Sequence, residues 1–265
     1  MIERNLHVSH LDESPLLLQE HGRVLVLTMN RPQAKNAMTL QLAEQLARAL
    51  DYFDGNDSLS VAIITGAGGT FCAGMDLKGF ARGEIPVVPS RGFAGLVQSP
   101  PRKPLIAAVE GYALGGGFEI ALACDLIVAA ANASFGLPEV KRGLTANGGG
   151  LLRLPQRLPY HLAMEVVLTG RMLPAAEAAS LHLVNRIAEP GTALASALEL
   201  AAEIAKNAPL ALAASKAVMV NSADWPVAEK FTQQQEHVAA IRTSRDAAEG
   251  ARAFIEKREP VWSGS

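Results

Sequence analysis

The stretch LIAAVEGYALGGGFEIALACD, residues 105–125, contains the change of pattern that decides the fold. It begins with an uninterrupted apolar run, residues 105–109, which is typical of a strand buried on both faces of a parallel sheet. Three consecutive glycines at 115–117 then lead into a predicted helix from about residue 116 to residue 123. A buried strand that passes through a glycine turn into a helix indicates an α/β fold.

Apolar runs on both sides of this stretch extend the α/β pattern. The runs at residues 16–19 and 24–29 predict a β-hairpin, and residues 61–65 and 126–129 predict two more buried strands. Thr39 is expected to cap a helix, because leucines follow it at helical spacing. Strands therefore alternate with helices in the first part of the chain.

The chain is expected to divide into three regions. Residues 1–14 form a polar N-terminal tail, residues 15–200 the α/β core, and residues 201–265 a C-terminal helical region. From residue 148 onward the sequence is rich in alanine and leucine, which predicts helices alone. Within the core, the proline-containing segment 79–104 is expected to form a mobile cover.

The composition excludes several classes of protein. Lys and Arg total 24 against 26 Asp and Glu, and a net charge of −2 excludes a strongly basic nucleic-acid or membrane binder. The longest uncharged stretch, residues 58–75, contains four glycines and does not predict a membrane span. Cys72 and Cys124 are expected to be buried free thiols, and the six histidines show no metal-ligand spacing. We therefore expect a soluble, cytoplasmic protein with no nucleic-acid or membrane partner.

Two glycine-rich junctions that follow predicted strands are candidates for a ligand site. The first is residues 71–77, after the strand at 61–65, and the second is residues 115–119, after the strand at 105–109. Ligands of α/β sheets bind beyond the carboxyl ends of strands, and two unobstructed backbone N–H groups aimed at one point form an oxyanion hole. Tight packing or turning is the alternative role for these glycines.

Two carboxylates lie in otherwise apolar surroundings. Glu119 falls in the first turn of the glycine-led helix, and Glu139 ends a stretch that is uncharged from Leu126 onward. Burial and a neighbouring carboxylate both raise a carboxyl pKa, and such pairs can divide acid and base roles. A glutamate that complements the helix dipole and a surface carboxylate are the alternative interpretations, and spacing alone leaves both open.

The order and spacing of several motifs resemble the crotonase (enoyl-CoA hydratase/isomerase) superfamily along nearly the whole chain from about residue 15. The motifs are Asn30-Arg31-Pro32 with Asn36-Ala37-Met38, Ala73-Gly74-x-Asp76, Gly111-Tyr112-Ala113-Leu114-Gly115-Gly116-Gly117-Phe118-Glu119, Ala123-Cys124-Asp125, Phe135-Gly136-x-Pro138-Glu139 and Ala253-Phe254-Ile255-Glu256-Lys257-Arg258.

This resemblance implies that the backbone N–H groups of Met75 and Gly116 form an oxyanion hole for the thioester oxygen of an acyl-CoA. It also implies that Glu119 and Glu139 are the two glutamates of a hydratase. Coenzyme A belongs to the substrate, so no metal or separate cofactor is expected. Seven further positions are expected to bind CoA or substrate: Ala73, Gly74, Asp76, Leu77, Gly115, Phe254 and Lys257. The contacts of Phe254 and Lys257 are often made across a subunit boundary.

The same resemblance implies a spiral of ββα turns whose C-terminal helices mediate a homotrimer, two of which commonly stack into a homohexamer. The implied enzyme is an enoyl-CoA hydratase that adds water to a trans-2-enoyl-CoA, giving a 3-hydroxyacyl-CoA, in fatty-acid or related acyl-CoA catabolism. A 3-enoyl-CoA to 2-enoyl-CoA isomerase and a non-catalytic acyl-CoA-binding protein are the alternatives. Residues 143–150 depart from the pattern of many hydratases, which leaves the acyl group unspecified.

Overall fold

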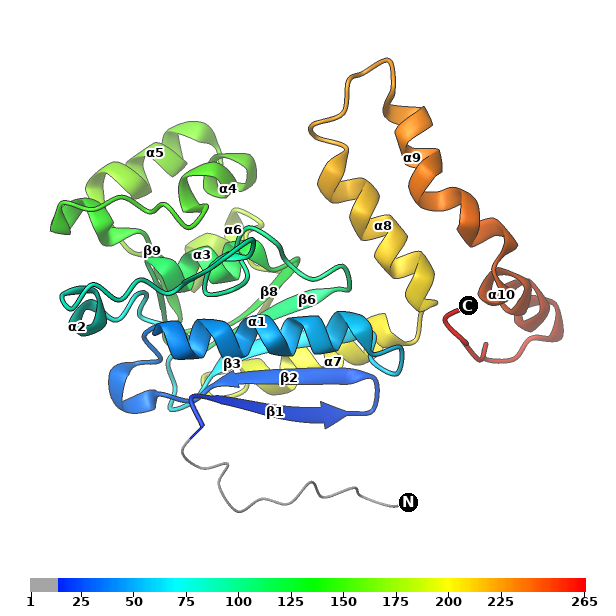
Figure 1. The fold of residues 1–265 in the computed structure, drawn as a ribbon, viewed down its shortest axis with the longest axis horizontal. Helices are drawn as coiled ribbons and strands as arrows, with labels where there is room; N and C mark the ends of the chain where they lie inside the picture. The colour runs from blue at the N-terminus through cyan, green and yellow to red at the C-terminus, as the bar shows by residue number, and fades with distance from the viewer. Residues whose placement is uncertain (1–13) are drawn as a thin grey trace.

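The computed structural model describes residues 14–265, so the predicted tail lies outside the described residues except for Ser14. Its largest element is a six-stranded sheet in the order β1-β2-β3-β6-β8-β11 (Figure 1). β1 and β2 pair antiparallel, and all other neighbours are parallel. The predicted hairpin and the three predicted buried strands are all present. The strands are β1 (Leu16–His21), β2 (Val24–Met29), β3 (Val61–Gly66), β6 (Leu105–Val109), β8 (Leu126–Ala130) and β11 (Arg186–Ala188).

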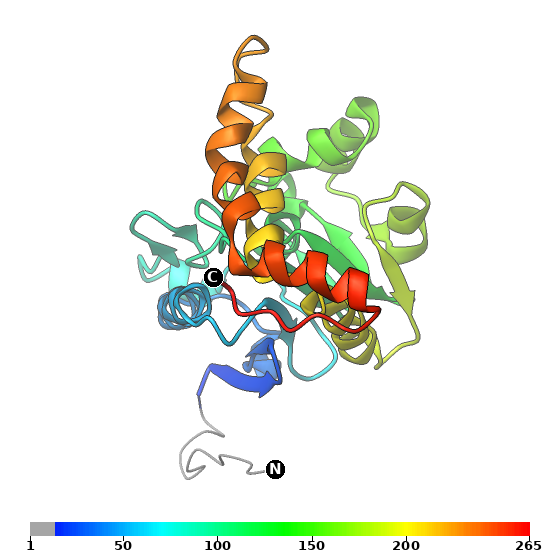
Figure 2. The same cartoon turned by 90° about the vertical axis from the view of Figure 1, so that its right-hand side faces the viewer.

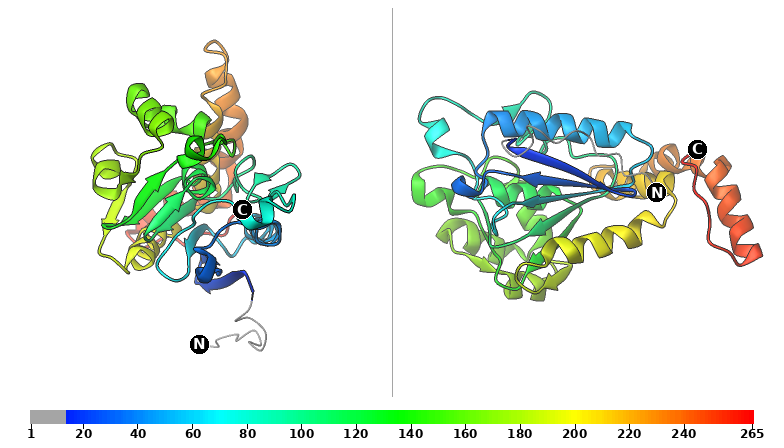
Figure 3. Two further views of the ribbon diagram at one scale, coloured as in Figure 1. Left: turned by 90° about the vertical axis from the view of Figure 1, so that its left-hand side faces the viewer. Right: turned by 90° about the horizontal axis from the view of Figure 1, so that it is seen from below.

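Helices cover both faces of this sheet, and Figure 3 shows α1 (Leu40–Gly55) and α7 (Ala193–Ala205) on opposite sides of the strands. Strand side chains alternate between these faces. On β2, Val26 packs in the cluster that contains α7, whereas Leu27 packs in the cluster that contains α1. The cap predicted for α1 is confirmed, because the Thr39 hydroxyl accepts a hydrogen bond from a backbone N–H of the first turn at 3.3 Å.

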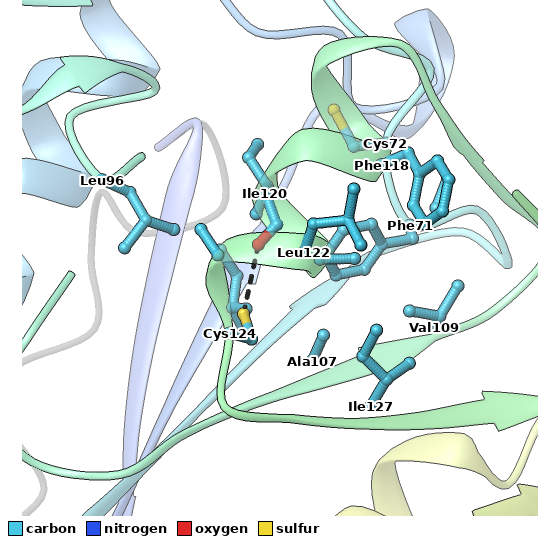
Figure 4. Packing of buried hydrophobic residues seen from close by; sticks show 14 of the residues in the cluster. Phe71, Cys72, Leu96, Ala107, Val109, Phe118, Ile120, Leu122, Cys124 and Ile127 are labelled. Atoms are coloured by element: carbon cyan, nitrogen blue, oxygen red, sulfur yellow. Dashed lines mark hydrogen bonds between the residues drawn. The ribbon is translucent and has the colours of Figure 1, made fainter. Parts of the chain in front are cut away.

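Helix α3 (Gly116–Ala123) is buried along its whole length, with the bounds that the sequence predicts. Figure 4 shows Phe118 and Leu122 packed above Val109 and Ile127 of the central strands. Because every residue of this helix is buried, Glu119 in its first turn is buried with the apolar side chains. The packing of α3 therefore places a carboxyl group in the interior.

Both cysteines are buried and free, as the sequence predicts. The Cys124 thiol donates a hydrogen bond to the Ile120 carbonyl oxygen at 3.3 Å (Figure 4). Burial raises the pKa of the Cys72 thiol to about 12, which keeps it protonated at neutral pH. Both thiols are therefore parts of the core.

Short strands beyond the central sheet complete a repeating unit. β7 (Tyr112–Leu114) follows β6, and β9 (Ser134–Gly136) follows β8. These two strands pair in parallel in a second sheet that β10 (Leu173–Pro174) completes. In the chain, β6 and β7 are followed by α3, and β8 and β9 are followed by the 3-10 helix η2 (Pro138–Arg142). The predicted ββα turns are therefore present.

The prediction of helices alone after residue 148 is wrong. Strands β10 and β11 interrupt the series of helices, and β11 forms an edge of the large sheet by pairing with β8. A strand of three residues is too short to show the alternation by which strands are recognised. The boundary expected after residue 200 falls inside α7, and the division into core and helical region stays a prediction. The first helices of this part are α4 (Gly150–Arg157), α5 (Tyr160–Thr169) and α6 (Ala175–Ser180).

Three C-terminal helices, α8 (Pro209–Asn221), α9 (Lys230–Val238) and α10 (Arg245–Glu256), project from the body of the molecule (Figures 1 and 2). An ion pair joins α8 to the core, because Nζ of Lys216 lies 2.6 Å from Oδ2 of Asp125. Within residues 14–265, no helix is both long and apolar enough to cross a membrane. The same residues contain no group of three or more His, Cys, Asp or Glu side chains that could hold a metal ion.

Candidate active site

A pocket of about 400 Å³ lies beyond the carboxyl ends of β3 and β6, where the two glycine-rich junctions were predicted to form a site. Part of its wall is formed by α2 (Leu77–Phe80), which leads into the covering segment, and by the hairpin of β4 (Val87–Val88) and β5 (Gly92–Phe93) within that segment. Eight of the predicted site residues line this one pocket. They are Ala73, Gly74, Met75, Leu77, Gly115, Gly116, Glu119 and Glu139.

The two glycine junctions lie directly against each other. Cys72 bonds to one edge of β7, because its N–H donates to Tyr112 O at 2.9 Å and its carbonyl oxygen accepts from Leu114 N at 2.9 Å. A methyl group at Gly74, whose φ is +98°, would lie 2.9 Å from the Leu114 carbonyl oxygen, and one at Gly117 would overlap Cys72 O. Glycine is therefore required at both positions, because only a residue without a side chain allows the loops to approach so closely.

This contact brings the backbone of the first junction close to the start of α3. A methyl group at Gly74 would lie 3.4 Å from the Gly116 nitrogen, so the residue before Met75 adjoins the start of α3. Gly116 is the first residue of that helix, and its N–H has no acceptor within the helix. Paired N–H groups at a helix start can stabilise negative charge on a bound oxygen atom.

The N-terminal motif around Asn36 holds the first junction in place. The buried Asn36 amide donates to Ala67 O at 2.9 Å and to Thr70 O at 2.6 Å. Met38 N donates to Gly74 O at 2.7 Å, which joins the motif directly to the loop. The motif therefore supports the first glycine junction through hydrogen bonds to its backbone.

Asp76 fixes its own loop rather than lining the pocket. Its carboxylate pairs with Arg31 at 3.0 Å and accepts hydrogen bonds from the N–H groups of Lys78 and Gly79, which caps α2. Burial pushes the pKa of Asp76 upward, but the bonds from Arg31 and Gly79 outweigh it and hold that pKa below its usual value. Its predicted contact with CoA stays a prediction.

Glu119 is almost fully buried, with 3% of its surface exposed. Its Oε1 accepts a hydrogen bond from Gly150 N at 2.9 Å, and a methyl group at Gly148 would lie 2.5 Å from its Oε2. Burial raises the pKa of Glu119 to about 7, the Gly150 N–H opposes this rise, and the charge of Glu139 adds to it. A carboxyl with this pKa can accept or donate a proton near neutral pH.

Glu139 approaches the same pocket from η2, where Pro138 begins the helix. A methyl group at Gly115 would lie 2.9 Å from Glu139 Oε1, so this carboxyl adjoins the second junction. Its Oε2 is buried and has no hydrogen-bond partner among the residues that the structure describes. Burial raises the pKa of Glu139, while its own backbone N–H and the charge of Arg142 act in the opposite direction. A buried acceptor without a partner is suited to bind a group from the substrate or a water molecule.

Sequence reasoning missed two residues that shape the pocket, Phe93 and Arg153. Phe93 packs against Gly116, where any added methyl group would overlap its ring. Arg153 on α4 holds the covering segment, because its Nη2 donates at 2.6 Å to the carbonyl oxygen of Val97, which lines the pocket. The apolar residues of the covering segment were a signal for the contact of Phe93 with Gly116. No local pattern in the sequence marks the hydrogen bond between Arg153 and Val97.

Phe254 and Lys257 lie apart from the pocket in this chain. They belong to the end of α10 in the projecting C-terminal arm, and Phe254 is 86% exposed. Neither lines the pocket. Their expected contact with CoA therefore requires a second subunit and stays a prediction.

Comparisons with known proteins agree with this geometry. A family model described as enoyl-CoA hydratase/isomerase matches residues 19–265. A carnitinyl-CoA dehydratase from Salmonella enteritidis is 45% identical over 257 residues, which cover 94% of this chain and 98% of that protein. The crystal structure of an enoyl-CoA hydratase from Mycobacterium tuberculosis is similar with a TM-score of 0.94 at 56% identity, covering 96% of this chain and 100% of that one. The crystal structure of a carnitinyl-CoA hydratase from Mycobacterium avium has a TM-score of 0.77 at 42% identity, and the match covers 95% of this chain and 99% of that one.

These matches confirm the predicted family and the crotonase-like α/β fold. They extend over the ββα turns, both glycine junctions and both glutamates, as well as the C-terminal helices. The chain therefore belongs to the enoyl-CoA hydratase/isomerase (crotonase) family.

Proposed function

We propose that this chain catalyses the reversible addition of water to a trans-2-enoyl-CoA, giving a 3-hydroxyacyl-CoA. The observation that carries the proposal is the pair of glutamates, Glu119 and Glu139, which both have raised pKa values and line one pocket beside two glycine junctions. Relatives named as hydratases and dehydratases support a reaction in which water is added or removed.

The glycine junctions polarise the thioester. Its carbonyl oxygen accepts hydrogen bonds from the N–H groups of Met75 and Gly116, which draws electron density away from C3. Negative charge moves onto that oxygen as the enolate develops, and each N–H stabilises this charge more strongly than it stabilises the neutral carbonyl. One such donor typically contributes about 10²- to 10³-fold in rate.

The two carboxyls supply the proton transfers. A water molecule between them adds its oxygen to C3 and gives a proton to Glu119, and Glu139 gives its own proton to C2. The pair thus begins and ends with one proton: Glu139 carries it before the reaction, and Glu119 carries the proton taken from water afterwards. Neither step removes electrons or needs a Lewis acid, so we propose that coenzyme A is the only cofactor involved, as part of the substrate.

We expect kcat/KM for hydration and dehydration to follow the same bell-shaped dependence on pH. The active form carries one proton on the pair, and the reaction itself neither takes up nor releases protons. Activity should fall as the pH rises past about 7, the pKa of Glu119, because the two glutamates then lose their shared proton. It should also fall in acid, where both carboxyls are protonated. Steady-state rates measured in both directions would show this, and a curve that is flat through pH 7 would contradict it.

One assay separates the proposed activity from its alternatives. The protein is incubated with crotonyl-CoA and with longer 2-enoyl- and 3-enoyl-CoA esters, while the ultraviolet absorbance of the conjugated thioester is followed. We expect loss of this absorbance from 2-enoyl esters, which reports hydration. Its appearance from 3-enoyl esters alone would show an isomerase, and binding without either change would show a non-catalytic acyl-CoA-binding protein.

We also propose that the chain assembles as a homotrimer or a dimer of trimers through its C-terminal helices. Large apolar side chains on these helices and on the connection between α8 and α9 are strongly exposed in the single chain, and an assembly would bury them. Light scattering with chromatography should give three or six chains, whereas a monomer would contradict the proposal. The exposed side chains are Met219, Val220, Val227, Phe231, Phe254 and Ile255.

A further inference from the structure

Arg142 is the only basic side chain among the described residues that line the pocket. It is the last residue of η2, three positions after Glu139. Residues three apart in a 3-10 helix lie one above the other, so Arg142 is on the same side of η2 as Glu139. The positive charge of Arg142 acts on the Glu139 carboxyl: burial raises the pKa of Glu139, and Arg142 lowers it. Arg142 therefore acts on the carboxyl that, in the proposed reaction, exchanges a proton with C2.

The guanidinium of Arg142 is free to bind a ligand. Its side chain is exposed, and it makes no hydrogen bond or ion pair with any other residue between 14 and 265. The other arginines close to the site are engaged, since Arg31 pairs with Asp76 and Arg153 donates to Val97 O. A free guanidinium offers five donors in a planar arrangement that matches a carboxylate.

Three neutral side chains add hydrogen-bonding capacity to the same pocket. Thr145 and Asn147 come from the segment that departs from the pattern of many hydratases, and Gln98 comes from the covering segment. An acyl group made only of hydrocarbon would exclude water from these polar groups without replacing its hydrogen bonds. An acyl group with acceptor oxygens would replace them.

The balance of charge at the site favours a negative acyl group. With one proton shared between them, Glu119 and Glu139 together carry a single negative charge. Arg142 contributes one positive charge, and the half-buried Arg153 near Glu119 contributes another. A carboxylate beside Arg142 would gain a charge-assisted hydrogen bond, whereas a cationic group there would be repelled.

We propose that the preferred substrates are 2-enoyl-CoA esters whose acyl group carries a carboxylate beyond C3, and that Arg142 binds this carboxylate. The inference rests on the proposed function and names its substrate class. It also distinguishes this chain from its relatives named for a carnitinyl group, because that group carries a quaternary ammonium ion, which Arg142 would repel.

The test compares 2-enoyl-CoA esters of matched shape in which C4 carries a carboxylate, an isopropyl group or a trimethylammonium group, together with a second set one methylene longer. For the wild-type chain we expect kcat/KM to be highest for the carboxylate ester of at least one set and lowest for the trimethylammonium ester. In Arg142→Met, the ratio of kcat/KM for the carboxylate ester to that for the isopropyl ester should fall by about tenfold to hundredfold.

Lys141→Met is the matched control, because Lys141 is the adjacent basic residue of η2 and does not line the pocket. This variant should keep the wild-type ratio. A parallel fall in Arg142→Met for all esters would assign Arg142 to the phosphates of coenzyme A and overturn the proposal. A wild-type preference for the isopropyl or trimethylammonium ester would overturn it as well.

The failures of the two proposals can be told apart. Hydration of crotonyl-CoA without any preference for a carboxylate would overturn only the assignment of Arg142 and its substrate class. If no 2-enoyl-CoA ester is hydrated, the proposed function fails, and the inference that rests on it fails too.

Discussion

Replacing Glu139 with glutamine will lower kcat for hydration by about 10²- to 10⁴-fold, while the Kd for an acyl-CoA changes little. Glutamine keeps the size of the side chain but cannot give a proton to C2 or take one from it. The affected oxygen, Oε2 of Glu139, has no hydrogen-bond partner among residues 14–265, so the substitution breaks no bond made by that atom. Turnover and ligand binding measured on the same preparation test this expectation.

Glu44→Gln is a suitable control for Glu139→Gln. Glu44 is an exposed glutamate on α1 that lies outside the pocket, so its loss removes the same charge without affecting the site. Wild-type turnover is expected in this control. If Glu139→Gln also retains full turnover, Glu139 has no part in the proton transfers.

Gly148→Ala will also lower kcat by about 10²-fold or more, although position 148 carries no functional group. The added methyl group would lie 2.5 Å from Oε2 of Glu119, so the carboxyl must move. The flexible end of a side chain yields more readily than backbone, and we therefore expect a folded protein whose Glu119 is displaced. The expected loss is of the size that removing a general base causes.

A double-mutant cycle tests whether the effect of Gly148→Ala passes through Glu119. In a Glu119→Gln background, adding Gly148→Ala should cost little further activity, because the group that it displaces has already lost its function. Thermal unfolding checks that both proteins are folded. Losses that multiply in the double variant would show that Gly148 acts by another route.

The central part of the fold could be predicted from the sequence because its signals are local. The apolar run of β6, the glycines after it and the largely apolar α3 follow one another within twenty-one residues, and the structure has the predicted bounds for both elements. Strand β11 could not be predicted, because its three residues form a strand only by pairing with β8, far away in the sequence. Its pairing is a tertiary effect that no local pattern shows.

In the candidate site, too, residues with a local sequence signal could be predicted, whereas their long-range contacts could not. Charge in apolar surroundings made Glu119 and Glu139 candidates, the family resemblance assigned them as a pair, and the structure brings both to one pocket. The groups that set their properties were not identified, because they come from elsewhere in the chain. Gly150 binds Glu119 across thirty-one positions, and Phe93 reaches Gly116 from the covering segment. A glycine gives no sign in the sequence of which side chain it must accommodate.

The supporting contacts of the first junction are also long-range. The motif around Asn36 was recognised by resemblance alone, and its physical role became apparent only from its bonds to Ala67 and Thr70. The structure thereby explains why an asparagine is suited to this position. One amide group can bond to two carbonyl oxygens of a loop that begins thirty-one residues later.

The most direct test of the account is a crystal structure of the protein with a 3-hydroxyacyl-CoA bound. We expect the thioester oxygen within hydrogen-bonding distance of the backbone nitrogens of both Met75 and Gly116, with the carboxyls of Glu119 and Glu139 beside C3 and C2. A thioester bound away from these two nitrogens, or reacting carbons out of reach of both carboxyls, would contradict it.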